Sequence, residues 1–436
     1  MFEYFTDPVL RAPTWGCMLM CLAASLMGVL SFLNKRSLLG EGISHAAYPG
    51  VVAGMAVCAI DAADEGSLFF ALVGALLFSI IGLWVIDRLE KKGKVHSDAA
   101  LCFMLASFFG IGTLGASFLQ GARPLMAQRV QIYLYGQAAT MTDIHIVIYA
   151  ALSALIVMFL VISYRPMQAL CFDRVYAQSL MIVPRYLTIA TFVLMLLSIV
   201  IGIRSVGVVL MSGMFVAPAV AARQWTDRLS TLLWIAAIIG VASGLLGNIL
   251  SVEASQKLRI YFPHERLSLP TGPMIVLTGS AIAFLSLLFA PRRGAIPRLV
   301  RILSFRVRTV EENILKSVWK SKEISLKDCR ACNHLWPPSL IFLLWRMQRQ
   351  GWMTQAYRRY ALTPDGDRKA ARIVRLHRLW EVYLADLGWP EESVHRTAEE
   401  MEHILTPELE ERLAGQLHDP KLDPHAQPIP EHDVVC

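Results

Sequence analysis

The chain has 436 residues, of which 55% are hydrophobic and 17% charged, and its formal net charge is +7 at pH 7. These averages combine two parts. Apolar runs fill the sequence up to about Pro291, whereas the segment from Arg292 onward has the composition of a soluble domain. A wholly soluble protein is therefore excluded. The net charge does not indicate nucleic-acid binding by the whole chain, because much of it lies in loops beside apolar runs, where basic residues mark the cytoplasmic side of a membrane.

The first 291 residues are predicted to form an all-α polytopic membrane domain. Apolar stretches of spanning length lie near 14–33, 43–60, 66–87, 99–120, 144–163, 186–203, 230–252 and 272–290, with a shorter one at 207–222. Nine crossings that start outside place most basic loops inside, as the positive-inside rule requires; the loop at 253–271 is the exception. Eight crossings remain open if 207–222 only dips into the bilayer. Both arrangements predict a multi-pass plasma-membrane protein with a cytoplasmic C-terminal domain.

The second apolar stretch begins with ionisable residues, Glu41 and His45, four positions apart. This spacing puts a carboxylate and an imidazole on one helical face. Ionisable groups at membrane depth usually line a polar path, and this donor pair suits Mn, Fe or Zn. The residues alone leave another interpretation open, in which Glu41 lies in water at the cytoplasmic end and His45 caps a bend before Pro49.

The stretch from Leu38 to Gly50 resembles the signature of the zinc/manganese/iron ABC permease family, known as ABC-3, whose members read G-D-A-[IL]-S-H-A-x-x-P-G. Glu41 stands here for the usual Asp, and Gly42 for the usual Ala. Further matching stretches are 133–136, 171–173, 206–210 and 217–219, and the resemblance covers about 14–290. It implies a bacterial inner-membrane importer permease in which Glu41 and His45 line the transport pathway.

The same resemblance implies partners. The inner loop with Phe172 and Asp173 would form the coupling helix that docks on an ABC ATPase subunit. The chain has no G-x-x-x-x-G-K-[ST] run, so ATP hydrolysis is expected on that separate chain, and this chain is not expected to be an enzyme. An extracytoplasmic metal-binding protein and a second permease subunit, identical or related, complete the expected importer. Which of Mn, Fe or Zn is carried stays open.

The C-terminal part divides into three predicted segments. Residues 292–308 form a basic, amphipathic linker suited to a membrane surface. Helices are expected at 309–321, 325–331 and 337–350, with a strand-turn-strand within 352–362. This order indicates a winged-helix-like domain over 309–370. A helical metal-binding and dimerisation domain is expected over 371–436.

Histidines are concentrated there: seven of the eleven lie in 334–436. His377 and Glu381 are four residues apart on one predicted helix, and a stripe on the next comprises His395, Glu399, Glu402 and His403. Imidazoles and carboxylates that share helical faces can hold a divalent transition metal, either as substrate or as regulatory ligand. A solvated face of a charged helix would give the same pattern.

Residues 309–430 resemble the iron- and manganese-dependent repressors of the diphtheria toxin repressor type. The matching stretches are 312–316, 362–366, 375–381, 394–403 and 423–430. The resemblance implies metal positions at His377, Glu381, Glu399, Glu402 and His403, with His395 in an ancillary role. Glu399 favours Mn, because it replaces the thiolate of iron-type members with a hard carboxylate.

Two departures from these repressors matter. Asn313 replaces the usual Asp or Met ligand, and Lys316 stands where manganese-type members have a Glu, so a full two-metal site is not expected. The helix expected to read DNA carries Ile341 and Phe342 where polar side chains are usual. The candidate phosphate contacts are Arg346, Arg349, Arg358 and Arg359.

Three roles for the C-terminal domain follow. The favoured one is a cytoplasmic metal sensor that regulates uptake. The alternative is a metal-dependent transcriptional repressor of the uptake operon. The third is a dimerising remnant that only stabilises the permease pair.

Overall fold

The computed structural model describes residues 3–34, 39–57, 64–172, 185–261, 269–333, 337–357, 359–403 and 407–431. Asp173 and Arg358 lie outside these residues. The chain separates into two compact units, Met1–Arg298 and Leu299–Cys436. Each is described by itself.

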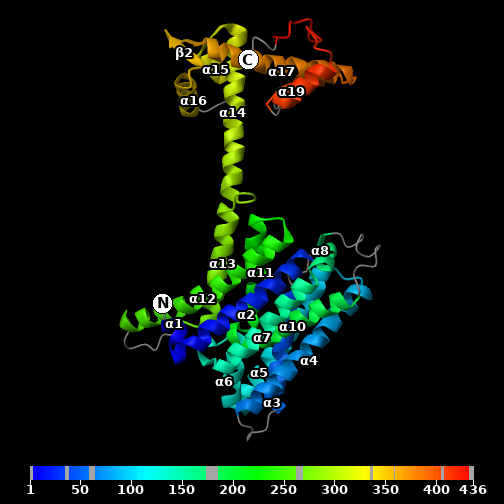
Figure 1. The fold of residues 1–436 in the computed structure, drawn as a ribbon, viewed down its shortest axis with the longest axis vertical. Coiled ribbons are helices and arrows are strands. Elements are labelled where there is room, and N and C mark those ends of the chain that lie inside the picture. Colours follow the sequence, from blue (N-terminus) through cyan, green and yellow to red (C-terminus); the bar gives the residue numbers. More distant parts are fainter. Residues whose placement is uncertain are drawn as a thin grey trace. The chain divides into compact units, whose positions relative to one another are not determined.

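The first unit is helical throughout its described residues, and its helices pack side by side (Figure 1). They are α1 (Glu3–Thr6), α2 (Pro8–Leu33), α3 (Leu39–Val57), α4 (Asp64–Lys91), α5 (Ser97–Ala122), α6 (Pro124–Tyr135), the 3-10 helix η1 (Ala138–Thr140), α7 (Asp143–Ile162), α8 (Tyr164–Phe172), α10 (Arg185–Val206), α11 (Val208–Trp225), α12 (Leu229–Tyr261) and α13 (Thr271–Phe289).

Seven of these helices are long and apolar enough to cross a membrane, with mean hydropathy between 1.8 and 2.6. They are α2, α4, α5, α7, α10, α12 and α13, and they match seven of the nine predicted stretches. The predicted class, an all-α polytopic membrane domain, is confirmed. The stretches at 43–60 and 207–222 form α3 and α11, which fall outside the seven.

These two helices lie in the interior of the first unit. In α3, 15 of 19 residues are buried, and the described side chains of α11 include no exposed one before Trp225. A helix surrounded by other helices needs no lipid-facing apolar surface and can carry polar residues at low cost. This explains why α3 is where Glu41 and His45 occur.

Close approach of α3 to α4 depends on small residues. A methyl group added at Gly50 would lie 2.1 Å from the carbonyl oxygen of Gly74, and the same holds in reverse. The two backbones are therefore in direct contact, and α3 is held firmly at its middle.

The second unit combines a small sheet with helices. Its elements are α14 (Ala295–Ser321, which begins in the first unit), β1 (Glu323–Ser325), α15 (Leu326–Asn333), α16 (Pro337–Arg349), β2 (Met353–Ala356), β3 (Arg359–Leu362), α17 (Pro364–Asp386), α18 (Glu391–Met401) and α19 (Pro407–Gln416). The sheet is antiparallel in the order β1-β3-β2, with Tyr360 paired to Ile324 and to Gln355. The predicted winged helix is confirmed. Strand β1 was not predicted, and residues 295–308 of the predicted linker belong to α14.

Helix α17 begins with a full set of start signals. Thr363 is the N-cap and its hydroxyl accepts a hydrogen bond of 3.1 Å from the backbone N–H of Gly366. Pro364 occupies the first turn together with Asp365 and Asp367, which favour the positive end of the helix dipole. The helix then continues for 23 residues and brings His377 and Glu381 onto one face.

Candidate metal centre

Three of the predicted donors converge in the second unit. One ligand atom from each of His377, Glu381 and His395 lies within 4.8 Å of the other two. Glu381 Oε1 is 3.1 Å from His377 Nε2 and 2.6 Å from His395 Nδ1, and the two imidazole nitrogens are 3.2 Å apart. His377 and Glu381 are buried, whereas His395 is exposed. We call these three residues the donor triad.

The chemistry of the donor triad fits a divalent transition metal. Two imidazoles and a carboxylate form a mixed N/O set that suits Mn, Fe or Zn. A cavity of about 370 Å³ adjoins the triad and is lined also by Glu392, Asp423 and His425. The cavity leaves room for water or further ligands beside the bound ion.

The protonation of the triad reflects its hydrogen bonds. Burial raises the pKa of Glu381, but the hydrogen bonds and charges of His377 and His395 outweigh it and lower the pKa to about 2. Burial lowers the pKa of His377, and the hydrogen bonds to Glu381 and Glu402 outweigh this and raise it. Glu381 is therefore an anion at neutral pH, and a metal ion would compete with protons for His377.

A second cluster lies on the other side of the His377 ring. Glu402 Oε2 is 2.5 Å from His377 Nδ1, and the ammonium of Lys316 lies 2.8 and 3.0 Å from the two oxygens of Glu402. Burial raises the pKa of Glu402, whereas His377 and Lys316 lower it further than burial raises it. Glu402 is thus a buried carboxylate that already has a cationic partner.

A third cluster involves the last predicted donor, His403. Its Nδ1 is 2.7 Å from Glu312 Oε2, and the other oxygen of Glu312 accepts a 2.7 Å hydrogen bond from Arg308 Nε. Burial raises the pKa of Glu312, but these two partners lower it overall. Neither Glu312 nor Arg308 was predicted as a site residue, because the contact of Glu312 with His403 joins parts of the chain that are far apart in the sequence.

The predicted stripe on α18 is only partly realised. The helix ends at Met401, which leaves Glu402 as the C-cap and His403 beyond it. Glu399 is exposed and forms no hydrogen bond or ion pair with the described residues. Three of the six predicted donors therefore form the triad, two pair with α14, and Glu399 stands apart.

The membrane unit contains the other predicted pair. His45 is 7% exposed, and its Nδ1 is buried without a hydrogen-bond partner in the described part of the chain. The ring lies edge-on to Phe109, with 5.0 Å between centroids. Helix α3 continues through Pro49, so His45 lies within the helix. Glu41 lies one turn earlier and is half-buried.

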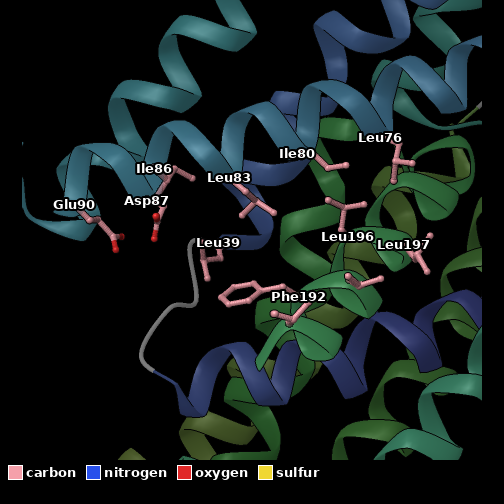
Figure 2. A pocket seen from close by; sticks show the side chains of 12 residues that line it. Leu39, Leu76, Ile80, Leu83, Ile86, Asp87, Glu90, Phe192, Leu196 and Leu197 are labelled. Carbon is pink, nitrogen blue, oxygen red and sulfur yellow. The ribbon is translucent and has the colours of Figure 1, made fainter. Parts of the chain in front are cut away.

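A mainly apolar cavity of the membrane unit lies away from His45. It measures about 490 Å³ and lies between α4 and α10, where Leu76, Ile80 and Leu83 face Phe192 (Figure 2). The carboxylates at one end are engaged: Asp87 pairs with Lys91, and Glu90 accepts a hydrogen bond from Ser97. Most of its described lining is aliphatic or aromatic, and neither Glu41 nor His45 belongs to it.

The remaining predicted residues divide between partnered and undescribed positions. Phe172 is the last residue of α8, and its side chain is not described. Arg346 pairs with Glu311 at 3.3 Å and Arg359 with Glu323 at 3.3 Å, while Arg349 stacks over Trp345. Helix α16 exposes Ile341, Phe342 and Trp345, as expected from its sequence.

Comparison with known proteins agrees with this division. The model of the ABC 3 transport family matches residues 6–290, more than half of the chain. The chain belongs to the ABC 3 transport family. A second model, the metal binding and dimerisation domain of iron dependent repressors, matches residues 363–431. The family assignment predicted from the stretch around His45, and the repressor-like C-terminal domain, are both confirmed.

Relatives of this ABC 3 chain share its length and its class. A "probable metal transport system membrane protein" of Chlamydia trachomatis is 35% identical over 98% of this chain and 97% of its own length. The manganese transport system membrane protein MntC of Bacillus subtilis is 28% identical over 85% of this chain and 82% of its own. PsaBC of Streptococcus pneumoniae shows the same fold for the membrane unit, with a TM-score of 0.56 at 20% identity over 69% of this chain and 97% of that one. The chain is thus a multi-pass membrane protein of an ABC transport family, whose permeases are non-enzymatic subunits.

Proposed function

We propose that this chain is the permease subunit of an ABC importer for a divalent transition metal, Mn, Fe or Zn, and that its C-terminal domain is a cytoplasmic metal sensor that regulates uptake. The observation that carries the proposal is the donor triad in a domain fused to an ABC 3 permease. Relatives named for manganese and zinc transport support the substrate class.

Transport in this proposal passes His45. A buried imidazole nitrogen without a partner is costly, and a passing metal ion would supply that partner. Glu41, one turn away on the same helix, adds a carboxylate that attracts cations. The coupling region at Phe172 and Asp173 would dock on a separate ABC ATPase. An extracytoplasmic metal-binding protein and a second permease subunit would complete the importer.

The test separates the pathway from the sensor. With the ATPase and binding protein co-expressed, His45→Ala is expected to lower ⁵⁴Mn uptake at least tenfold, because the buried donor is lost. Glu381→Gln is expected to leave initial uptake intact and to abolish its decline as internal Mn accumulates. Glu411→Gln, a matched change at an exposed residue of α19, should behave as the wild type. Full uptake by His45→Ala would overturn the pathway, and feedback that persists in Glu381→Gln would overturn the sensor.

The winged-helix fold favours one other candidate, a metal-dependent transcriptional repressor of the uptake operon. Opposing it is the exposed face of α16, where Ile341 and Phe342 offer no hydrogen bonds to base edges. Metal-dependent retardation of the operon's promoter DNA by the protein would favour this candidate over direct regulation of uptake.

A further inference from the structure

One face of α14 carries three charged residues in succession. Arg308, Glu312 and Lys316 are four residues apart, which places them above one another on the helix. Glu312 binds Arg308 through one carboxylate oxygen and His403 through the other. Lys316 contacts Glu402 and His377. Helix α14 therefore places two cations, Arg308 and Lys316, beside the predicted donors of α17 and those at the end of α18.

Of the two cations, Lys316 is more deeply buried than Arg308. Its side chain is 8% exposed and that of Glu402 is 0% exposed. A buried carboxylate requires a cationic partner or a set of donors, and the ammonium contacts both oxygens of Glu402. A divalent ion bound by Glu402 would lie directly against this ammonium, and the two positive charges would repel each other strongly at low local polarity.

The two nitrogens of His377 face different neighbours. Nδ1 faces Glu402 at 2.5 Å, with the Lys316 ammonium at 3.1 Å, and Nε2 faces Glu381 and His395. If Nδ1 donates its proton to Glu402, the lone pair of Nε2 is directed at the donor triad. A carboxylate that accepts from the second nitrogen of a ligating histidine fixes both the tautomer and the ring orientation.

We infer that the ammonium of Lys316 permanently takes the place of a second cation beside Glu402, so that the sensor domain binds one divalent metal per chain, at His377, Glu381 and His395. Glu402 is then a positioning residue for His377 and not a metal ligand. The inference rests on the proposed function and specifies the stoichiometry of its sensor site.

The experiment measures bound Mn²⁺ per chain by elemental mass spectrometry on the purified full-length protein, equilibrated with excess Mn²⁺ and freed of unbound ion. Lys316→Glu removes the ammonium and puts a carboxylate beside Glu402 and His403, and it is expected to bind one more Mn²⁺ per chain than the wild type. Lys327→Glu carries the same charge change at an exposed residue of α15, away from the lining of the triad cavity, and is expected to match the wild type. Glu381→Gln is expected to bind one fewer.

Glu402→Gln keeps the test decisive should Lys316→Glu fail to fold. A positioning role predicts an unchanged number of bound ions at saturation, with affinity weakened about 10–100-fold. If Glu402 were instead a ligand of a second metal ion, Glu402→Gln would lose an ion that Glu381→Gln retains. That result would overturn the inference. An unchanged count in folded Lys316→Glu would also overturn it while leaving the sensor site in place. An unchanged count in Glu381→Gln would overturn the sensor site itself.

Discussion

At the residue scale, ionisation of Glu381 within the donor triad contributes to the stability of the second unit. Glu381 is buried, yet the two histidines lower its pKa from 4.5 to about 2. Because the folded-state pKa lies below that of the unfolded chain, the ionised carboxylate stabilises the folded state above pH 4.5. This contribution is lost as the pH falls from 4.5 toward 2. Its size is about 3 kcal/mol, shared with the two histidines and not additional to theirs.

Metal-free protein should therefore become less stable between pH 4.5 and 2, with part of the loss attributable to Glu381. Denaturant unfolding in a chelator, followed by tryptophan fluorescence, is expected to show a shallower acid dependence for Glu381→Gln than for the wild type. Glu411→Gln serves as the control, since the exposed Glu411 lacks these partners. Identical acid profiles for Glu381→Gln and the wild type would contradict the argument.

The sequence predicted some of these residues and not others, for geometrical reasons. His377 and Glu381 could be paired because four residues make one helical turn, whatever else the fold does. His395 could be joined to them only through the resemblance to repressors, because α18 is a separate helix. Glu399 lies within α18, but its exposed side chain has no hydrogen-bond or ion-pair partner among the described residues, so its role as a ligand stays a prediction. The roles of Arg308 and Glu312 depend on the contact of Glu312 with His403, which lies beyond the end of α18 and far away in the sequence, and no local pattern encodes such a contact.

At the element scale, α3 is the element on which the transport proposal depends. Hydropathy predicted the seven helices of spanning length well, because crossing a bilayer requires a long apolar segment. It was less informative for α3, which is covered by protein and so can carry Glu41 and His45. What positions α3 is contact of its backbone with α4 at Gly50 and Gly74. The three-residue strand β1 was missed because so short a strand has no detectable alternation.

Gly50→Ala should accordingly lower both thermal stability and metal uptake. The added methyl group would lie 2.1 Å from the carbonyl oxygen of Gly74, and overpacking of this kind costs about 1–3 kcal/mol. Gly110→Ala is the matched control in α5, where an added methyl group meets nothing within 4 Å. There the higher helix propensity of alanine should stabilise the helix by up to about 1 kcal/mol. Thermal unfolding of the two variants in detergent should thus shift in opposite directions, and shifts of the same sign would refute the packing argument.

At the scale of the whole molecule, composition alone predicted a membrane part followed by a soluble part, and matches to two different families coincide with these parts. What composition could not predict is what the second part acts on. Under the proposed function, fusion of the repressor-like domain to a permease would give each permease its own sensor, at a fixed ratio and at the point of entry. A separate repressor would act only through synthesis of new protein, on the timescale of protein turnover.

The two outputs can therefore be distinguished by time. With the chain expressed from an unrelated promoter and transcription blocked, preloading cells with Mn should reduce uptake within minutes in the wild type, because the sensor is part of the permease. Glu381→Gln should show no such reduction, since the triad has lost its carboxylate, whereas Lys327→Glu, at an exposed residue of α15, should respond as the wild type does. If uptake in the wild type declines only when transcription is allowed, direct regulation is wrong, and the winged helix acts on DNA despite the apolar face of α16.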